Sequence, residues 1–163
     1  MKARLWIAAV AGAALFASPA LAQPASAPPE YGPPITLAQA KKVMAAAEAE
    51  AKKAPFPVAI YIVEPSGEMV MMERMDNTQY GSVALAQKKA ETAAMFKRPS
   101  QVFQDHVQAN VYLLQLGAPT VVGGGVPIME HGKVIGAIGV SGSPTSSQDE
   151  VVAKAGIEAL GKK

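Results

Sequence analysis

The 163-residue sequence predicts an α+β fold, in which helices pack on an antiparallel sheet. Short apolar runs occur as two adjacent pairs, and each pair is joined by a short turn. Segments with helical periodicity precede, separate and follow these pairs, which gives the order α-β-β-α-α-β-β-α. A Rossmann fold is excluded, because its parallel sheet requires β-α-β crossovers.

Residues 1–22 have the pattern of a secretory signal peptide. Lys2 and Arg4 precede an apolar stretch, and residues 20–22 (Ala-Leu-Ala) form an A-x-A cleavage signature. The apolar stretch is shorter than the roughly 18 residues that a membrane span needs. We therefore expect cleavage before Gln23, a periplasmic or secreted protein, and no membrane span in the mature chain. The alternative is an uncleaved N-terminal anchor.

The mature chain is predicted to begin with a flexible leader over residues 23–35 and to continue as a single domain over residues 36–163. The leader is rich in proline, alanine and serine, a composition typical of extended linkers. Thr36 and Gln39 form a T-x-x-Q capping box, which marks the start of the first helix.

The first half of the domain is predicted to contain a helix, a hairpin and a second helix. Apolar residues at helical spacing cover residues 37–53, and two prolines then end the helix. Apolar runs at 58–64 and 68–75 flank a Pro-Ser-Gly turn. Residues 82–96 are again helical in period, and their face of valine and alanine side chains predicts close packing on a sheet.

The second half is predicted to contain the same kinds of element, and it begins after Pro99, which ends the second helix. Ser100 is expected to cap the third helix, and Ser147 with Glu150 to form a capping box for the last one. Helical periodicity predicts the third helix at residues 101–109 and the last helix at residues 148–160. Apolar runs at 126–129 and 133–140 predict a second hairpin between them.

Charge and composition exclude several functions. Removal of Lys2 and Arg4 from the 15 basic residues leaves 13, against 13 acidic residues, so the mature chain has no net charge. Without a basic patch, we expect no binding of nucleic acid. The absence of cysteine excludes disulfides, cysteine-ligated metals and covalent haem attachment through C-x-x-C-H. Such an exported domain relies on its core or on oligomerisation for stability.

Two common active-site patterns are absent from the sequence. Glycines 123–125 lack the Lys-Ser/Thr and the helix that follow a phosphate loop, and are instead expected to adopt positive φ in a sharp turn. No G-x-S-x-G elbow occurs, and the chain has only two histidines, His106 and His131. His131 falls at the expected tip of the second hairpin, so we interpret it as a turn residue.

Three features leave alternatives open. The methionines of strand 68–75 either fill an irregular core or face a cofactor or partner subunit, because methionine also ligates haem iron and soft metals. His106 is either a half-buried core residue or a haem ligand. Arg74 lies just before a helix, where it either holds an anionic group or pairs with Asp76.

Three long stretches of the chain carry a family resemblance: ERMDNTQYGSVALAQKKAETAAMFKRPS, GGGVPIMEHGKVIGAIGVSG and QDEVVAKAGIEAL. Over about residues 36–161, the chain resembles the GlcG/PduO-C (DUF336) family, which includes an extracellular haem-binding protein. The resemblance implies a profilin- or PAS-like antiparallel sheet of about four to five strands. It also implies homo-oligomers that bind haem noncovalently, for storage, transport or sensing, with a sensor or haem-acceptor protein as a partner.

The resemblance directs the haem hypothesis to six residues: Arg74, Met75, Phe96, Arg98, Ser100 and His106. Residues 96–100 match the family's F-x-R-P-S/T motif, whose ring, cation and hydroxyl suit a haem edge. Arg74 or Arg98 is expected to pair with the propionates. The candidate iron ligands are His106, Met75 and Ser100, because residues 23–60 contain no histidine to match the N-terminal ligand of some relatives.

An alternative function belongs to a different class. The chain could be a PAS-like module that binds a small carboxylate, or an accessory protein of glycolate or hydroxy-acid metabolism. Arg74 and the helix start near residues 80–82 would then hold the anion. No catalytic residue is predicted, and a binding role is favoured over an enzymatic one.

Overall fold

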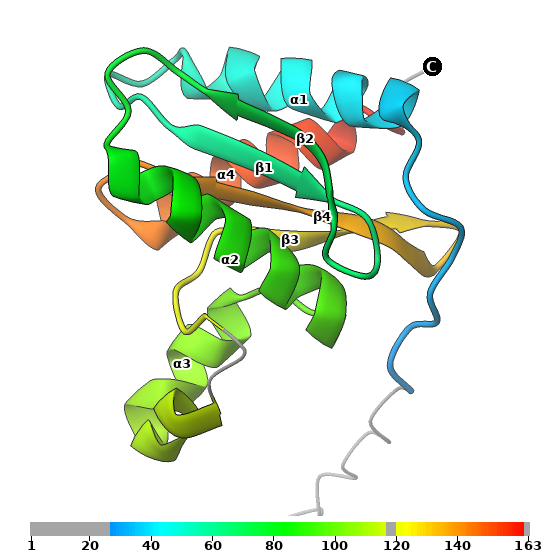
Figure 1. Ribbon diagram of the computed structural model, residues 1–163, viewed down its shortest axis with the longest axis vertical. Coiled ribbons are helices and arrows are strands. Elements are labelled where there is room, and N and C mark those ends of the chain that lie inside the picture. Colours follow the sequence, from blue (N-terminus) through cyan, green and yellow to red (C-terminus); the bar gives the residue numbers. More distant parts are fainter. Residues whose placement is uncertain (1–26, 117–119, 162–163) are drawn as a thin grey trace, which may run out of the picture.

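The computed structural model describes residues 27–116 and 120–161 (Figure 1). The elements expected from the sequence are all present, with ends within about two residues of those expected. The 3₁₀ helix η1 was not expected, because such short turns have no periodic signature. The order is α1 (Leu37–Ala51), β1 (Ala59–Val63), β2 (Met69–Arg74), α2 (Tyr80–Phe96), α3 (Gln101–Ala109), η1 (Val111–Leu116), β3 (Gly125–Glu130), β4 (Lys133–Ser141) and α4 (Ser146–Glu158).

The four strands form one antiparallel sheet in the order β2-β1-β4-β3. Helices α1 and α4 cover one face of this sheet, and α2 covers the other (Figure 1). The central strand β1 is buried along its whole length, whereas β2 is an edge strand with several exposed side chains. The predicted α+β class is confirmed, as a three-layer domain.

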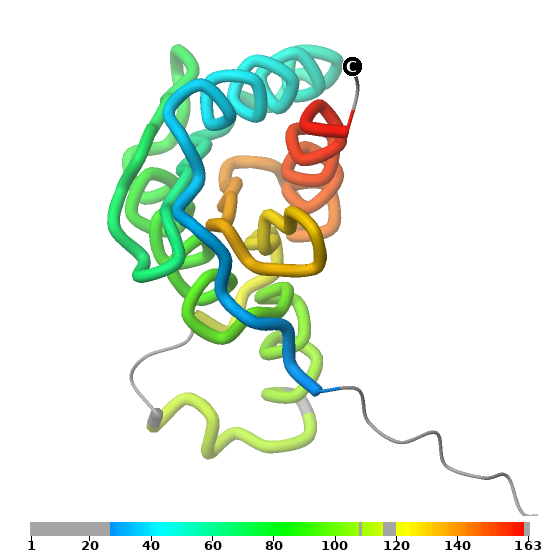
Figure 2. The backbone as a smooth tube through the Cα atoms, turned by 90° about the vertical axis from the view of Figure 1, so that its right-hand side faces the viewer, coloured from blue at the N-terminus to red at the C-terminus, as the bar shows by residue number. Residues whose placement is uncertain are grey.

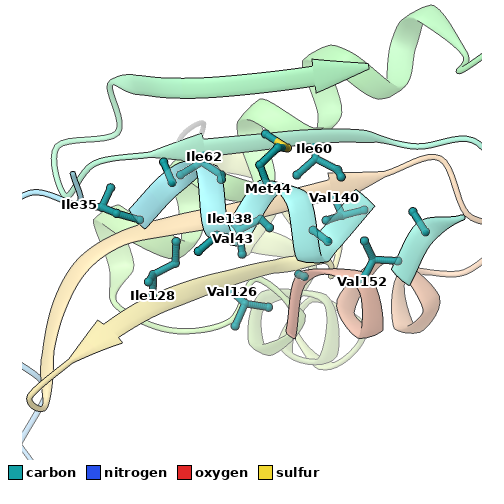
Figure 3. Packing of buried hydrophobic residues seen from close by; sticks show 14 of the residues in the cluster. Ile35, Val43, Met44, Ile60, Ile62, Val126, Ile128, Ile138, Val140 and Val152 are labelled. Atoms are coloured by element: carbon teal, nitrogen blue, oxygen red, sulfur yellow. The ribbon is translucent and has the colours of Figure 1, made fainter. Parts of the chain in front are cut away.

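The larger hydrophobic core lies between the sheet and the layer of α1 and α4 (Figure 3). Aliphatic side chains of all four strands, together with residues of both helices, fill this space. The two helices pack closely, because a β-carbon at Gly156 would lie only 2.9 Å from the carbonyl oxygen of Val43. Labelled members of the core in Figure 3 are Ile35, Val43, Met44, Ile60, Ile62, Val126, Ile128, Ile138, Val140 and Val152.

A smaller core lies on the opposite face, where α2 meets the sheet. Ala86, Ala90 and Ala93 are fully buried there, which confirms the predicted small-residue face of this helix. Gly139 on β4 lies beneath it, and a β-carbon at this position would be 2.1 Å from the carbonyl oxygen of Ala86. The backbone of the helix therefore rests almost directly on the sheet.

Local hydrogen bonds fix the starts of the helices. The reciprocal bonds of the capping box predicted for α1 are both present. The box predicted from Ser147 and Glu150 is wrong, because α4 begins earlier. Thr145 is the N-cap instead, and its hydroxyl accepts a hydrogen bond from the backbone N–H of Gln148 at 3.4 Å. The earlier start brings Asp149 into the first turn of the helix.

Residues 29–35, part of the predicted flexible leader, are docked on the domain, and we call this segment the strap (Figure 2). The backbone N–H of Gly32 donates to the carbonyl oxygen of Val134 at 2.8 Å. The N–H of Ile35 donates to the carbonyl oxygen of Ile135 at 2.7 Å. Strand β1 pairs with β4 only as far as Ala137, and the strap bonds to β4 beyond that point. The strap therefore continues the sheet where β1 ends.

A second set of contacts fixes the strap to the end of α2. The hydroxyl of Tyr31 donates to the carbonyl oxygen of Met95 at 2.9 Å, and also lies 3.2 Å from that of Ala94. The ammonium of Lys97 lies 4.5 Å from the centre of the Tyr31 ring and donates to the carbonyl oxygen of Pro29 at 2.9 Å. Tyr31 therefore supplies a hydrogen-bond donor to carbonyl groups in the last turn of α2, where the helix offers few partners of its own.

The second hairpin turns at His131 and Gly132, which have φ of 49° and 76°. Left-handed φ at both central residues is typical of a type I′ turn. His131 is exposed there, which confirms its interpretation as a turn residue. Of the glycines expected at positive φ, only Gly124 adopts it, at 109°. Gly125 instead permits close packing, because a β-carbon there would lie 2.1 Å from the carbonyl oxygen of Lys89.

Helix α3 and η1 project away from the three layers (Figures 1 and 2). We call residues 101–116 the arm. Within residues 27–116 and 120–161, no helix is long and apolar enough to cross a bilayer.

Candidate functional site

The candidate site is the arm junction, residues 96–106, where α2 ends and the arm begins. Lys97 ends α2 in the left-handed conformation, with φ of 53°, and so redirects the chain. The rings of Phe96 and Phe103 then meet edge to face, with centroids 5.1 Å apart. Phe103 is buried and Phe96 half-buried, so this aromatic pair attaches the arm to the body of the domain.

Ser100 is completely buried and does not cap α3 with its side chain, contrary to expectation. Its hydroxyl donates to the carbonyl oxygen of Val122 at 2.8 Å and accepts from the backbone N–H of Gly125 at 2.9 Å. The hydroxyl therefore ties the arm junction to the loop before β3. Because Ser100 is completely buried, ligation of a metal by its hydroxyl would disturb this connection.

His106 is exposed in the last turn of α3, one helical turn beyond Phe103. The half-buried core environment considered for this histidine is therefore absent, and its imidazole is accessible. Three apolar side chains of η1 that follow are largely exposed, with exposed fractions of 65% for Val111, 71% for Tyr112 and 60% for Leu114. No role was expected for these residues, although the run VYLLQL is a signal of an apolar surface.

Arg98 is exposed at the arm junction, and its Nε donates to the carbonyl oxygen of Phe96 at 3.2 Å. This bond uses one of the five guanidinium N–H groups, so the others are available to an anion. The guanidinium is therefore held near the backbone of Phe96, one member of the aromatic pair.

Arg74 and Met75 lie elsewhere, at the end of β2 that precedes α2. This helix has 17 residues and is about 25 Å long, so it separates these two residues from Phe96 and the arm junction at its far end. Met75 is half-buried against the larger core. The guanidinium of Arg74 lies 5.3 Å from the centre of the Tyr80 ring, and the ion pairs among the described residues do not include Arg74 with Asp76.

The methionines of β2 divide between two environments. Met71 packs against the larger core, like Met75 beyond the strand. Met69 and Met72 are exposed, at 58% and 41%. The core interpretation therefore holds for Met71 and Met75, and the exposed Met69 and Met72 stay candidates for contact with a cofactor or partner subunit.

Lys89 is a buried charged residue that sequence analysis missed. It lies on the alanine face of α2, where only small apolar side chains were expected, and it is paired with Asp149. Burial lowers the pKa of the Lys89 ammonium, and the Asp149 carboxylate opposes this effect. The available signal was a lysine whose helical neighbours Leu85, Ala86 and Ala93 are apolar.

The residues of the arm junction can be compared with the requirements of haem. Haem needs an axial ligand, a cation for its propionates and apolar contact for the porphyrin. His106, Arg98 and the Phe96–Phe103 pair supply one group of each kind within a single stretch of chain. Ser100 fits poorly, because its hydroxyl is buried and already makes two structural hydrogen bonds. The donor set of the arm junction therefore fits haem.

The fold and this donor set define a small α+β domain with a candidate cofactor-binding junction. Residues 35–158 match the family described as "Haem degrading protein HbpS-like", and the chain belongs to this HbpS-like family. The chain is 39% identical over 129 residues to an uncharacterized 15.0 kDa protein in the dhaT-dhaS intergenic region of Citrobacter freundii, covering 76% of this chain and 90% of that protein. It is 36% identical over 104 residues to protein GlcG of Escherichia coli K12, covering 63% and 77% of the two chains.

Two solved structures have the same fold. The PduOC:heme complex is 28% identical, with a TM-score of 0.70, and the match covers 77% of this chain and 94% of that one. A double mutant of HbpS from Streptomyces reticuli is 27% identical, with a TM-score of 0.74, over 88% and 97% of the two chains. The predicted membership of the GlcG/PduO-C family is confirmed.

Proposed function

We propose that the mature protein is an exported haem-binding protein that holds haem noncovalently at the arm junction. The observation that carries the proposal is an exposed imidazole, His106, one helical turn from Phe103 of the aromatic pair and on the same short stretch as Arg98. The complex of the relative PduOC with haem supports the choice of cofactor.

In this proposal, each group of the arm junction has one role. His106 ligates the iron, Arg98 pairs with a propionate, and Phe96 together with the exposed side chains of η1 contacts the porphyrin. Bound haem would supply an iron centre for storage, transport or sensing. Self-association would add a second apolar surface to the exposed arm, and a sensor or haem-acceptor protein would be the partner.

A titration with hemin tests the proposal, and the chain offers a matched control in its only other histidine, His131. We expect a saturable shift of the Soret band for the wild type and for His131→Ala. We expect affinity to fall about tenfold or more in His106→Ala, because an iron–imidazole bond is lost. A flat titration of the wild type would refute haem binding. Equal saturation by both variants would refute His106 as the ligand.

A second measurement distinguishes binding from degradation, the activity in the description of the family. The protein–haem complex is incubated with a reductant in air. Binding without turnover predicts a Soret band that persists as long as that of a matched sample without reductant. Decay of the band with release of iron would assign an enzymatic role instead.

Export and self-association are part of the same proposal. The signal pattern of residues 1–22 and the exposed apolar arm support them. N-terminal sequencing of protein from the periplasm or medium should begin at Gln23. Light scattering coupled to gel filtration should give a mass above that of one mature chain, and a monomer at all concentrations would contradict self-association.

The second candidate function is the binding of a small carboxylate at the start of α2. Arg74 and Tyr80 are in contact there, and α2 has no side-chain cap at its first turn. Unpaired N–H groups and a nearby guanidinium favour an anion. Stabilisation of the protein by glycolate, lost in Arg74→Gln, with no response to hemin, would favour this function over haem binding.

A further inference from the structure

A cavity of about 150 Å³ opens at one end of the larger core, between the end of α1 and the first turns of α4. Ala51, Val58 and Val152 are buried and form an apolar wall. Ser143 and Gln148 also line the cavity and add polar groups. A cavity of this volume holds a molecule about the size of benzene.

Backbone packing preforms the cavity. Helices α1 and α4 are in close contact at Gly156, and the cavity lies toward the other end of this helix pair. The wall formed by residues 56–58 is fixed by Gly142, because a β-carbon there would lie 2.4 Å from the carbonyl oxygen of Pro57. Such contacts between backbones leave little freedom for the cavity to collapse.

Two polar side chains of the cavity can act as hydrogen-bond donors. Gln148 Oε1 accepts a hydrogen bond from the hydroxyl of Thr145 at 3.0 Å, which leaves the two N–H groups of its amide. Ser143 donates its backbone N–H to Asp149 Oδ1 at 3.0 Å, and its hydroxyl takes no part in that bond. At the rim, Lys53 is paired with Glu50, so the rim has no net charge.

We propose that this cavity binds a small organic molecule with an apolar body about the size of one aromatic ring and a single oxygen acceptor, either a carboxylate or an amide. The apolar wall would hold the body, and Gln148 with Ser143 would donate to the acceptor. A porphyrin is far larger than this cavity, so the site is separate from the arm junction and goes beyond the proposed function. Glycolate lacks the apolar body and should not bind here.

Benzoate, benzamide and glycolate are suitable probes, observed through the amide resonances of the ¹⁵N-labelled mature protein. We expect benzoate, benzamide or both to cause saturable shifts confined to residues around Val58, Ser143 and Gln148, with roughly millimolar affinity. Glycolate should leave these resonances unchanged. Shifts that do not saturate, that map to other parts of the domain, or that glycolate reproduces would overturn the proposal.

Two tryptophan variants localise the binding. Ala54 lines the cavity and is exposed, so Ala54→Trp should block the opening without overpacking the core. Ala84 is exposed on α2, outside the cavity, and Ala84→Trp is the matched control. We expect affinity for the aromatic probe to fall about tenfold or more in Ala54→Trp only. Equal affinity in both variants would overturn the site. Hemin binding should be the same in both variants. Failure of the cavity proposal can therefore be distinguished from failure of the proposed haem binding.

Discussion

Lys89 on α2 and Asp149 on α4 form an ion pair inside the domain, with Lys89 Nζ 2.7 Å from Asp149 Oδ2. Both side chains are almost completely buried, at 1% and 4% exposed. Lys89 Nζ also donates to the carbonyl oxygen of Val140 at 2.9 Å, and Asp149 Oδ1 accepts from the N–H of Ser143 at 3.0 Å. The pair therefore joins helices from opposite faces of the sheet through the end of β4.

Removal of one partner of this pair should destabilise the domain strongly. Asp149→Ala leaves the Lys89 ammonium buried without its counter-ion, and we expect the free energy of unfolding to fall by about 3–5 kcal/mol. The double variant Lys89→Met/Asp149→Leu should lose less, since no charge remains buried. Urea denaturation measures both, with Lys88→Met, at the exposed neighbouring position, as the control. A loss below about 1 kcal/mol in Asp149→Ala would show that the pair is not structurally required.

The close contact between α2 and the sheet predicts opposite effects for two glycine-to-alanine substitutions. Gly139→Ala should destabilise by about 1–3 kcal/mol or more, because the added β-carbon meets the carbonyl oxygen of Ala86 at 2.1 Å. Gly81→Ala, near the start of α2, meets no atom within 4 Å and should stabilise by about 0.5–1 kcal/mol. Chemical denaturation compares the two. Equal changes of stability would argue against the close approach of helix and sheet.

Local sequence signals accounted for most of the fold and for less of the candidate site. Hairpins, helix periodicity and the first capping box depend on neighbouring residues, so they could be predicted. The bonds of Tyr31 with the end of α2, and of Lys89 with Asp149, join residues far apart in the chain, and their local sequences do not specify a partner. Likewise, the F-x-R-P-S segment identified Ser100, but the carbonyl group that accepts its hydrogen bond belongs to Val122, 22 residues further along the chain.

The strap should contribute to stability through the Tyr31 hydroxyl. Tyr31→Phe removes its hydrogen bond to the Met95 carbonyl but retains the ring beneath Lys97. We expect a loss of about 0.5–1.5 kcal/mol, the usual net contribution of one hydrogen bond. Tyr112→Phe makes the same chemical change on the exposed η1 and should leave stability unchanged. Thermal denaturation of the two variants is the measurement, and equal stability of Tyr31→Phe and the wild type would argue against docking of the strap in solution.

A carboxylate pair predicts a pH-dependent effect on stability. Burial raises the pKa of Glu73 on β2 above its usual 4.5, and the facing carboxylate of Glu48 on α1 adds to this shift, while Lys52 opposes it. Because the folded state binds this proton more tightly than the unfolded state, the contribution to stability is fully present below about pH 4.5. It is lost as the pH rises through the folded-state pKa.

Glu73→Gln mimics the protonated side chain, so it should stabilise the protein at pH 7 and have no effect near pH 4. We expect a rise in Tm of roughly 1–3 °C at neutral pH, since the pair is partly exposed to solvent. The control is Glu68→Gln, at an exposed position before β2. Thermal denaturation between pH 4 and pH 7 follows the effect. An effect that depends on ionisation disappears at low pH, where the carboxyl of Glu73 is protonated in both the folded and the unfolded state. A gain in Tm of the same size at pH 4 and pH 7 would therefore contradict the coupling between Glu73 and Glu48.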